Sequence, residues 1–568
     1  MNESSSLSSR IRKYRMHYII VLPALLLLFI FKGVPFLTAL YMPFTDFKPY
    51  RGIFGSSWAG MQNFQSLFQL PEFRQAFTNT IVLNVGYVFV AGVAGLLLSL
   101  ALAAIRWERL RRLFSTMFLL PYFVPSVTFA YAFTIVMSPD RSPFFDWDAF
   151  WLGNSGWFRW SAIAAETLKT VGVPALIALT AIASRHEAAY GSESVTPGFG
   201  TQGYFYHTVV PAAKAVFAFA LLRLSMPLTS DFELMHALLN PLVYETGDTL
   251  STYLFRVGFQ QGQYSAASAV WLFQFVLQFL FAVAAYALLR GAFANALFSR
   301  FARPRVRPGN AGANVVGIAV SVGFGAVALL PLYVLFVVPL TSGGESEVSA
   351  WSLLSVPYAL AYGGLLLGAT FVHMLMTVTL AYPLTVKRLP GRQFYKLVLI
   401  FYACIGPVFF HDYLFFREIG LVGSAFAIPL SGFVSIVPVF VLKSIFNAKY
   451  ANLKEVREQE GRGELHAFFT LFLPNIWKAW VALGVLHLTT LGGTYWTSLL
   501  YLMTPETFPP LLQFVMLAGG MSADIGILPG DPRVLTFGAI ASLPGIVLFL
   551  LFRPWLTSEV LVSQVRRG

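Results

Sequence analysis

The sequence predicts an all-α polytopic membrane protein with about twelve transmembrane helices in two halves of six. Of its 568 residues, 57% are hydrophobic and only 11% are charged, whereas water-soluble domains carry about 25% charged residues. Uncharged runs such as 75–105 and 257–289 exceed the roughly 20 residues that cross a hydrocarbon core about 30 Å thick. These runs lack the two-residue alternation of barrel strands, which favours helices.

The first half begins with a polar, basic segment, and the apolar stretch after it has no small-residue cleavage site. We therefore expect a retained first span rather than a signal peptide. The six spans are expected at 17–42, 77–105, 113–137, 157–184, 208–230 and 265–289. The fourth and fifth are the least regular, because Arg159, Glu166 and Lys169 interrupt one and Lys214 and Arg223 the other.

The second half repeats the series of apolar runs. Its spans are expected at 314–340, 361–384, 397–414, 420–442, 477–497 and 534–556. The stretch 301–313, with two prolines, two glycines and several arginines, is the predicted cytoplasmic linker. The sequence thus divides into a first half at 1–300, this linker, and a second half at 314–568.

Basic residues gather in alternate short loops, although the net charge of +13 alone could suggest a nucleic-acid partner. They are Arg10, Arg12, Lys13 and Arg15; Arg106, Arg109, Arg111 and Arg112; Arg300, Arg303, Arg305 and Arg307; Lys387, Arg388, Arg392 and Lys396; and Arg566 and Arg567. With twelve spans, all of these fall on one side of the membrane, which is the positive-inside pattern. We therefore expect no nucleic-acid partner and place both termini in the cytoplasm.

Two long polar loops, 184–210 and 446–473, are then both cytoplasmic, each between the fourth and fifth spans of its half. Gly198 and Pro211 stand thirteen positions apart in the first loop, and Gly461 and Pro474 stand thirteen apart in the second. This repeated spacing indicates a transporter built from two equivalent halves.

The second loop predicts a short helix, a turn and an amphipathic helix. Glycines at 461 and 463 interrupt a charged run rich in helix formers, and apolar residues then recur at helical spacing. Those residues are Leu465, Phe468, Phe469 and Phe472. A protein partner that buries this apolar face is one interpretation, and an interfacial helix lying against lipid is the alternative.

The pattern of Glu455, Glu460, Gly461, Phe468 and Leu473-Pro474 resembles the cytoplasmic loop motif of permease subunits in binding-protein-dependent ATP-binding-cassette (ABC) importers. In that family the loop forms a coupling helix that seats on the ATPase subunit. The two alanines of the usual motif are replaced here by Val456 and Arg457. In the first half, a literal Glu187-Ala188-Ala189 lies too far from Gly198, so Ser192-Glu193-Ser194 takes the motif position.

The resemblance covers most of the chain and implies two six-helix halves of the type I importer fold. The stretch 17–80 and the run from Asn240 to Tyr264 are similar to carbohydrate-uptake permeases of bacterial oligosaccharide importers, and 381–392 and 499–501 are similar to the partner subunit. The implied coupling residues are Glu193, Gly198, Phe205, Pro211, Glu455, Glu460, Gly461, Leu465, Phe468 and Pro474. The implied location is the bacterial cytoplasmic membrane.

Nothing in the sequence predicts an enzyme. No Gly-x-x-x-x-Gly-Lys-Ser/Thr run occurs to hold a nucleotide phosphate, and the single cysteine, Cys404, excludes a cysteine cluster for a metal. The resemblance implies that ATP and Mg²⁺ bind to a separate cytoplasmic ATPase dimer, that a solute-binding protein delivers a carbohydrate at the outer face, and that this chain binds no cofactor and contacts lipid.

Polar residues in or near spans are the candidates for the substrate path, because burying them is costly without a partner or a water-lined cavity. They are Tyr122, Asp231, Glu233, His411, Asp412, Tyr495 and Trp496. A structural or interfacial role is the alternative for each. Glu166 and Lys169, three apart on one span, are expected to neutralise each other, and the lone histidines His373 and His487 are expected to be packed.

Three other functions remain open at this stage. An ion-coupled secondary transporter could have twelve spans in two halves, although it would not need paired cytoplasmic loops of matching spacing. A membrane-embedded glycan enzyme would need an acidic pair or metal cluster at a membrane face. A fused ABC permease for iron or thiamine fits the loops, but the Asn240–Tyr264 run favours an oligosaccharide.

Overall fold

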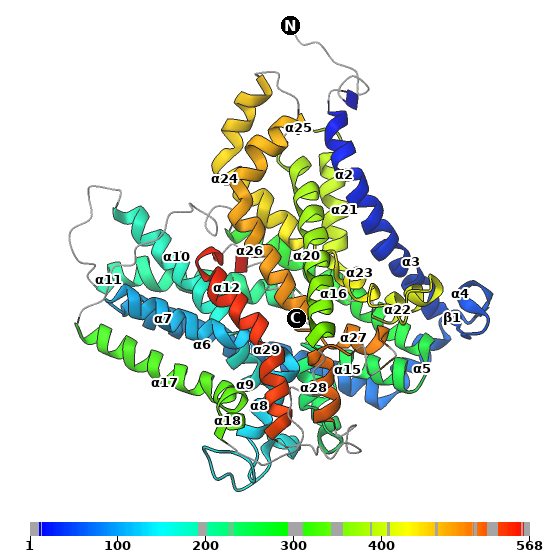
Figure 1. Cartoon of the computed structure of the whole chain (residues 1–568), viewed down its shortest axis with the longest axis horizontal. Helices are drawn as coiled ribbons and strands as arrows, with labels where there is room; N and C mark the ends of the chain where they lie inside the picture. Colours follow the sequence, from blue (N-terminus) through cyan, green and yellow to red (C-terminus); the bar gives the residue numbers. More distant parts are fainter. Residues whose placement is uncertain are drawn as a thin grey trace.

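The computed structural model describes residues 11–12, 14–190, 201–225, 228, 231–293, 311–341, 356–386, 389–405, 409–459, 464–502, 504, 508–519, 532–557 and 560–561. Within these ranges the protein is helical apart from one two-stranded ribbon, in which β1 (Thr45–Asp46) pairs antiparallel with β2 (Ser57–Trp58). The all-α class is confirmed. Figure 1 shows the helices as one assembly, with early and late parts of the chain interleaved.

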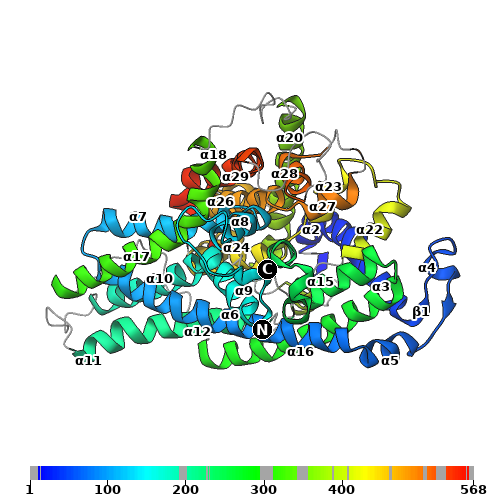
Figure 2. The same cartoon turned by 90° about the horizontal axis from the view of Figure 1, so that it is seen from below.

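The first series of helices runs to residue 293. It comprises α2 (Arg15–Leu28), α3 (Val34–Tyr41), α4 (Gly52–Gly55), α5 (Gln62–Gln69), α6 (Pro71–Ala104), α7 (Glu108–Leu119), α8 (Ser126–Val136), α9 (Ser155–Thr170), α10 (Gly172–Tyr190), α11 (Thr201–Tyr204), α12 (Val210–Leu224), α13 (Phe232–Leu238), α14 (Tyr244–Gly247), α15 (Leu250–Phe255) and α16 (Tyr264–Phe293). Figure 2 shows α6, α12 and α16 side by side along one edge of the molecule.

The second series begins at residue 311. It comprises α17 (Ala311–Phe336), α18 (Val338–Thr341), α20 (Val356–Leu384), α21 (Arg392–Cys404), α22 (Phe409–Glu418), α23 (Ala427–Gly432), α24 (Val437–Gln459), α25 (Glu464–Ala467), α26 (Leu473–Gly492), α27 (Trp496–Tyr501), α28 (Pro510–Ala518) and α29 (Pro532–Phe552).

Eight helices in the described residues are long and apolar enough to cross a membrane, and up to ten spans result if two bent pairs each count as one. The bent pairs join α7 to α8 at 105° and α9 to α10 at 50°. Pro121 and Pro125 fall between α7 and α8, where a missing N–H and a fixed φ break the helix. The protein is therefore a multi-pass membrane protein.

The expected spans at 397–414 and 420–442 are wrong as continuous helices. The first is divided between α21 and α22, and the second between α23 and α24. Neither break could be predicted from hydropathy, because hydropathy reports how long an apolar run is, not whether its backbone stays helical. The expectation that α26 begins near residue 477 is also corrected, because the helix extends back through a π-helical turn to residue 465.

The two series pack in the same order. α6 packs against α9, α10 and α12, and α20 packs against α23, α24 and α26; likewise α12 contacts α16 and α26 contacts α29. The first helix of each series crosses to the other, since α2 packs on α20 while α17 packs on α6 and α8. At this second crossing, a Cβ on Gly317 would lie 2.5 Å from the carbonyl oxygen of Ala101, so the close approach of α17 to α6 requires glycine.

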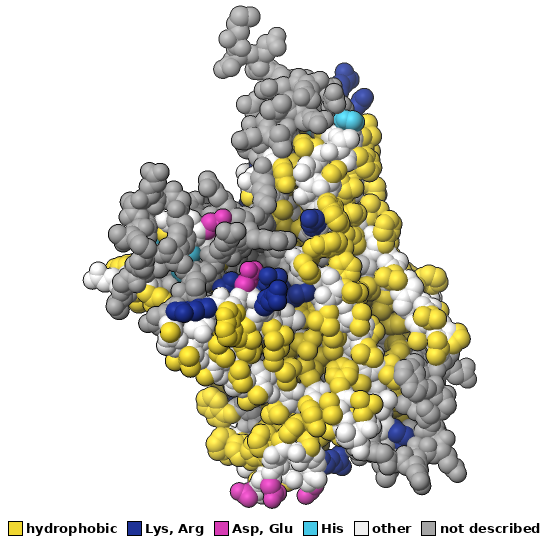
Figure 3. Space-filling model, turned by 60° about the vertical axis from the view of Figure 1, so that its left-hand side comes forward, with side chains coloured by type: hydrophobic (Ala, Val, Ile, Leu, Met, Phe, Trp, Pro, Cys, Tyr) yellow, Lys and Arg dark blue, Asp and Glu magenta, His cyan; other side chains and the backbone are white. Residues whose placement is uncertain are grey.

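A broad apolar surface wraps the outside of the helices. Figure 3 shows it as a continuous hydrophobic face, with Lys and Arg side chains grouped along one border and Asp and Glu side chains at the far end. Exposed apolar side chains on α6 and α17 contribute to the surface, including Val85, Phe89, Leu97, Val316 and Val320. An exposed apolar face of this extent suits contact with lipid.

Candidate functional site: a polar cavity between the two helix series

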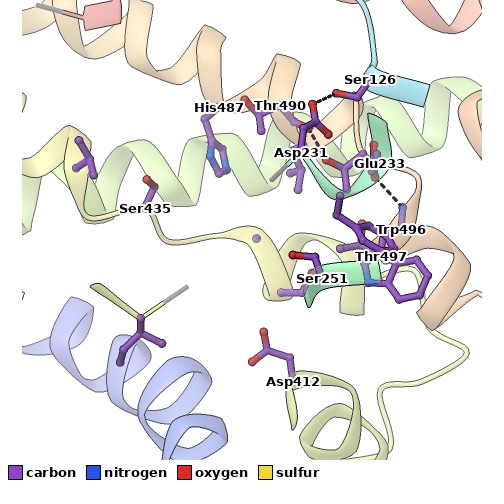
Figure 4. Close-up of a pocket in the computed structure, with 18 of the residues that line it drawn as sticks. Ser126, Asp231, Glu233, Ser251, Asp412, Ser435, His487, Thr490, Trp496 and Thr497 are labelled. Carbon is purple, nitrogen blue, oxygen red and sulfur yellow. Dashed lines mark hydrogen bonds between the residues drawn. The ribbon is translucent and has the colours of Figure 1, made fainter. Parts of the chain in front are cut away.

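A cavity of about 550 Å³ lies among helices of both series, within the ~300–1,000 Å³ usual for ligand pockets. Its polar lining includes Lys32, Ser126, Glu166, Lys169, Arg223, Asp231 and Glu233 from the first series and Asp412, Ser435, His487, Thr490 and Thr497 from the second. Figure 4 shows Asp231, Glu233 and Trp496 close together. The carboxylate of Asp412 points into the space that separates it from this group.

Asp231 is held in place at the cavity by two hydrogen bonds. The Ser126 hydroxyl donates to its Oδ2 at 2.6 Å. Its Oδ1 accepts the backbone N–H of Leu234 at 3.1 Å, so Asp231 is also the N-cap of α13. The carboxylate therefore has a fixed position between α8 and α13.

Glu233 joins the two helix series. Its Oε1 accepts the backbone N–H groups of Tyr495 at 2.9 Å and Trp496 at 3.1 Å. The Tyr495 hydroxyl lies 3.0 Å from Nδ1 of His236, and the rings of Phe232 and Trp496 are 5.1 Å apart. We call this group of contacts the Glu233 latch.

The carboxyl of Glu233 lies on α13, outside the candidate spans. Burial raises its pKa from the ordinary 4.5 to about 8, and the charge of Asp231 acts in the same direction. The two backbone N–H donors oppose this shift. Burial lowers the pKa of the neighbouring His236. Both side chains of the latch therefore favour their neutral forms.

The latch lies where equivalent positions of the two series meet. Phe232 and Tyr495, and likewise Glu233 and Trp496, are separated by 263 positions, the same separation as Gly198 and Gly461. Residues at equivalent positions contact each other only near a two-fold axis. The Glu233–Trp496 contact is therefore the expected location of such an axis.

Two ion pairs lie at the cavity. Lys32 on the first span contacts Asp412 on α22 at 3.2 Å, which again joins the two series. Arg223 contacts Glu166 at 2.8 Å. The expected pair of Glu166 with Lys169 is therefore wrong: Glu166 faces α12 and pairs with Arg223, while the Lys169 ammonium lies 5.4 Å from the centre of the Tyr122 ring.

The three histidines singled out from the sequence have defined neighbours. His373 and His487 are packed against each other and are not isolated, because their ring centres lie 3.7 Å apart in a stacked arrangement. His487 also lines the cavity. His411 is buried, and its Nε2 lies 3.0 Å from the Ser268 hydroxyl.

Of the seven predicted substrate-path residues, Tyr122, Asp231, Glu233, His411, Asp412 and Trp496 line the cavity. Tyr495 is not in the lining; it is buried behind it in the Glu233 latch. Sequence reasoning missed Lys32, whose signal was a lone cation in an otherwise uncharged first span. It also favoured a structural pair over a site for Glu166 and Lys169 and gave Arg223 no site role, although charged residues within spans were the signal available.

The two predicted coupling loops are only partly described. Glu193, Gly198, Glu460 and Gly461 lie outside the described residues, and Glu455 is described only as part of the α24 backbone. Phe205 and Leu465 are exposed, whereas Phe468 is buried against Tyr382 and Phe472. Pro211 and Pro474 each occupy the second residue of a long helix, α12 and α26.

The chain leading into these prolines has the same conformation in both series. A four-residue helix is followed by a π-helical turn, at Phe205–Val209 in the first series and Phe468–Phe472 in the second, and then by the long helix. The bounds of the short helix and of the turn, and the first residue of the long helix, are all displaced by 263 positions. Tyr206 and Phe469 are equivalent within these turns, and their side chains are 64% and 60% exposed.

No family model matches the chain. It is 28% identical over 292 residues to the polygalacturonan/rhamnogalacturonan transport system permease protein YteP of Bacillus subtilis, which covers 50% of this chain and 88% of the relative. It is also 24% identical over 206 residues to YtcP, a permease protein named for the same transport system in the same organism. That match covers 35% of this chain and 72% of the relative. A crystal structure of a bacterial ABC transporter that imports alginate aligns with a TM-score of 0.43 and 24% identity, over 51% of this chain and 100% of that one.

Proposed function

We propose that this ABC importer permease of the carbohydrate-uptake type carries two complete permease halves in one polypeptide and moves an oligosaccharide across a bacterial cytoplasmic membrane. The chain is a permease subunit and not an ATPase. The first half comprises residues 1–300, the linker comprises residues 301–313, and the second half comprises residues 314–568. The observation that carries the proposal is the polar cavity, because both helix series line it.

Three findings support two halves. The turns at Phe205–Val209 and Phe468–Phe472 match with a constant displacement. The first helix of each series packs on the other series. YteP and YtcP carry the same system name, and each is similar to part of this chain. A fusion of two such permeases accounts for all three.

The cavity suits a sugar in its chemistry. Hydroxyl groups need both donors and acceptors, and the lining offers carboxylates, hydroxyls and cations together with the rings of Tyr122 and Trp496. The relatives YteP and YtcP are named for polygalacturonan and rhamnogalacturonan transport. These observations support an oligosaccharide cargo rather than iron or thiamine.

The contacts between the halves suggest how access alternates. The Glu233 latch and the Lys32–Asp412 pair both join the two series. Separating the series at these points requires the contacts to break while the halves rotate against each other. A ligand or partner changes this equilibrium only by binding one state more tightly.

The proposed motor is a cytoplasmic dimer of ABC ATPases that holds ATP and Mg²⁺. It would seat on the coupling segments 198–211 and 461–474, one per half, where Tyr206 and Phe469 present exposed rings. An extracytoplasmic solute-binding protein would deliver the sugar on the opposite side. Both termini are then cytoplasmic, in agreement with the distribution of basic residues.

The test is transport by the chain together with the ATPase and solute-binding protein from its own genome, in proteoliposomes. We expect oligosaccharide uptake only with ATP on the ATPase side, and co-purification of the ATPase with the chain. Uptake driven by an ion gradient without nucleotide would instead identify a secondary transporter and refute the proposal.

A further inference from the structure

The charged groups that line the cavity balance one another. Arg223 pairs with Glu166 and Lys32 pairs with Asp412. The charged groups left in the lining are one cation, Lys169, and one carboxylate, Asp231, because the Glu233 carboxyl favours its neutral form. The lining thus holds one cation without an ion pair and no surplus of positive charge among the described residues.

Lys169 is buried with no hydrogen-bonding partner among the described residues. Only 6% of the residue is exposed, and its ammonium makes no ion pair or hydrogen bond with any described residue. The ammonium lies over the face of the Tyr122 ring. An ammonium has three N–H donors, and leaving them unpaired in a buried position is costly. Because the residue lines the cavity, its donors are available to a ligand.

An acceptor lies in the same lining on the other helix series. Oδ1 of Asp412 is buried and has no hydrogen-bond partner among the described residues, while Oδ2 is engaged by Lys32. The Thr497 hydroxyl oxygen is likewise buried without a hydrogen-bond partner among the described residues. Donors on one half and acceptors on the other match a ligand that both donates and accepts, as a sugar hydroxyl does.

We infer that the cavity selects uncharged sugar units, with Lys169 donating to a hydroxyl or ring oxygen and Asp412 accepting from a hydroxyl. A uronate carboxylate could meet Lys169, but it would also enter next to the Asp231 carboxylate, which already balances that cation. Further uronates along a chain would meet no second free cation in the described lining. Like charges in a poorly solvated cavity repel strongly. This inference rests on the proposed oligosaccharide function and restricts it to a neutral class, unlike the acidic glycans named for YteP and the alginate importer.

The experiment compares sugars that differ only in their carboxylates. Radiolabelled oligogalacturonides and oligomannuronates, and the carboxyl-reduced neutral form of each, are dialysed to equilibrium against the full chain in lipid nanodiscs. We expect at least one neutral form to bind at least tenfold more tightly than its acidic parent. Equal or tighter binding of the acidic parents would overturn the inference.

Two substitutions test the residues. Lys169→Met should weaken binding of the neutral sugar by about tenfold, because it removes a charged hydrogen-bond donor. Lys443→Met, which changes a half-buried lysine on α24 outside the cavity lining, is the matched control and should leave binding unchanged. Binding that is insensitive to Lys169→Met would overturn the assignment of this residue.

Asp231→Asn tests the repulsion separately. Asparagine can still cap α13 with its side-chain oxygen, and its NH2 group can donate to the Ser126 hydroxyl oxygen, but one negative charge is removed. The ratio of the dissociation constants for the acidic and the neutral sugar should fall severalfold. An unchanged ratio would contradict the electrostatic argument. If no sugar of either class binds, the cavity is not a sugar site. If acidic sugars bind and ATP-driven uptake persists, the proposed function stands and only the neutral selectivity fails.

Discussion

Glu233 shows how one carboxyl can both join the two helix series and respond to pH. Its folded-state pKa is raised by burial from 4.5 to about 8. Between these values the folded protein retains a proton that the unfolded chain has released, so this group lowers stability as pH rises from about 4.5 to about 8. We predict that Glu233→Gln, which cannot ionise, makes the fall in Tm over this interval shallower.

Thermal unfolding of the purified protein at several pH values measures this effect. Glu245→Gln, a change at an exposed glutamate four residues before the α15 cap, is the matched control and should retain the wild-type slope. Parallel wild-type and Glu233→Gln profiles would show that the carboxyl is already ionised in the folded state.

Removing the acceptor altogether should be more damaging. Glu233→Ala leaves the buried N–H groups of Tyr495 and Trp496 without their carboxylate, at a cost of about 1–3 kcal/mol for each. We predict a lower Tm than Glu233→Gln at pH 7 and, in the assembled transporter, higher ATPase activity without substrate because the halves separate more easily. A Tm equal to that of the Gln variant would mean that the two hydrogen bonds accepted by Glu233 contribute no stability.

At this scale the sequence predicted which residues gather but not how they pair. Asp231, Glu233 and Asp412 were identified because acidic groups beside apolar spans are rare, and all three line the cavity. The pairing of Glu166 failed because helical spacing shows only which residues share a face. Its true partner, Arg223, lies 57 positions away on another helix.

At the scale of single elements, the crossing of α17 over α6 makes a direct prediction. Gly317→Ala places a Cβ 2.5 Å from a backbone carbonyl oxygen on α6, whereas Gly323→Ala on the same helix meets nothing within 4 Å. Overpacking typically costs about 1–3 kcal/mol, so Gly317→Ala should lower Tm. Gly323→Ala should not, since alanine favours helix. Equal Tm values for the two variants would contradict the close crossing.

The two exposed aromatic residues of the π-helical turns predict a loss of coupling without loss of folding. Tyr206→Ala and Phe469→Ala remove rings that are more than half exposed. Under the proposed function, each should reduce ATP-driven uptake and retention of the ATPase while the free energy of unfolding stays within about 0.5 kcal/mol of wild type. Phe371→Ala, at an equally exposed phenylalanine on α20, is the control. Uptake at the wild-type rate in both variants would exclude these turns from the ATPase contact.

Helix positions followed from hydropathy, but helix breaks did not. The long helices α6, α17 and α20 lie where apolar runs predicted them, because length and composition decide whether a segment can span. The division of residues 397–414 and 420–442 into shorter helices depends on the neighbours that satisfy the freed backbone groups. The sequence of an apolar run does not show which groups will be its neighbours in the fold.

At the scale of the whole molecule, the proposed linker 301–313 should be dispensable. Residues 1–300 and 314–568, expressed as separate chains in one cell, are expected to associate and restore ATP-driven uptake to roughly the level of the intact chain. Contacts between described helices on either side of residues 301–310, such as α2 with α20 and α17 with α6, hold the series together. Co-purification of a tagged half with its partner measures association. Two halves that fold separately and do not associate would contradict this arrangement.

The exchange of first helices could not be predicted from the sequence, because an apolar stripe does not specify its partner. The repeated glycine–proline spacing predicted equivalence of the two loops, and the matching π-helical turns agree with it. The contact between Glu233 and Trp496 across equivalent positions emerged only in three dimensions.

The crossing of α17 onto α6 also bears on how the protein is made. During synthesis the surface of α6 that receives α17 has no cover until the chain has been extended past residue 336, long after α6 has left the ribosome. Likewise, α2 is inserted first, but the helix on which it packs, α20, is synthesised much later. A nascent chain stalled between these points has unfinished helix surfaces in the bilayer, where insertion chaperones or membrane proteases would recognise it. Biogenesis, rather than the finished fold, is therefore the stage at which this protein is most vulnerable to truncation.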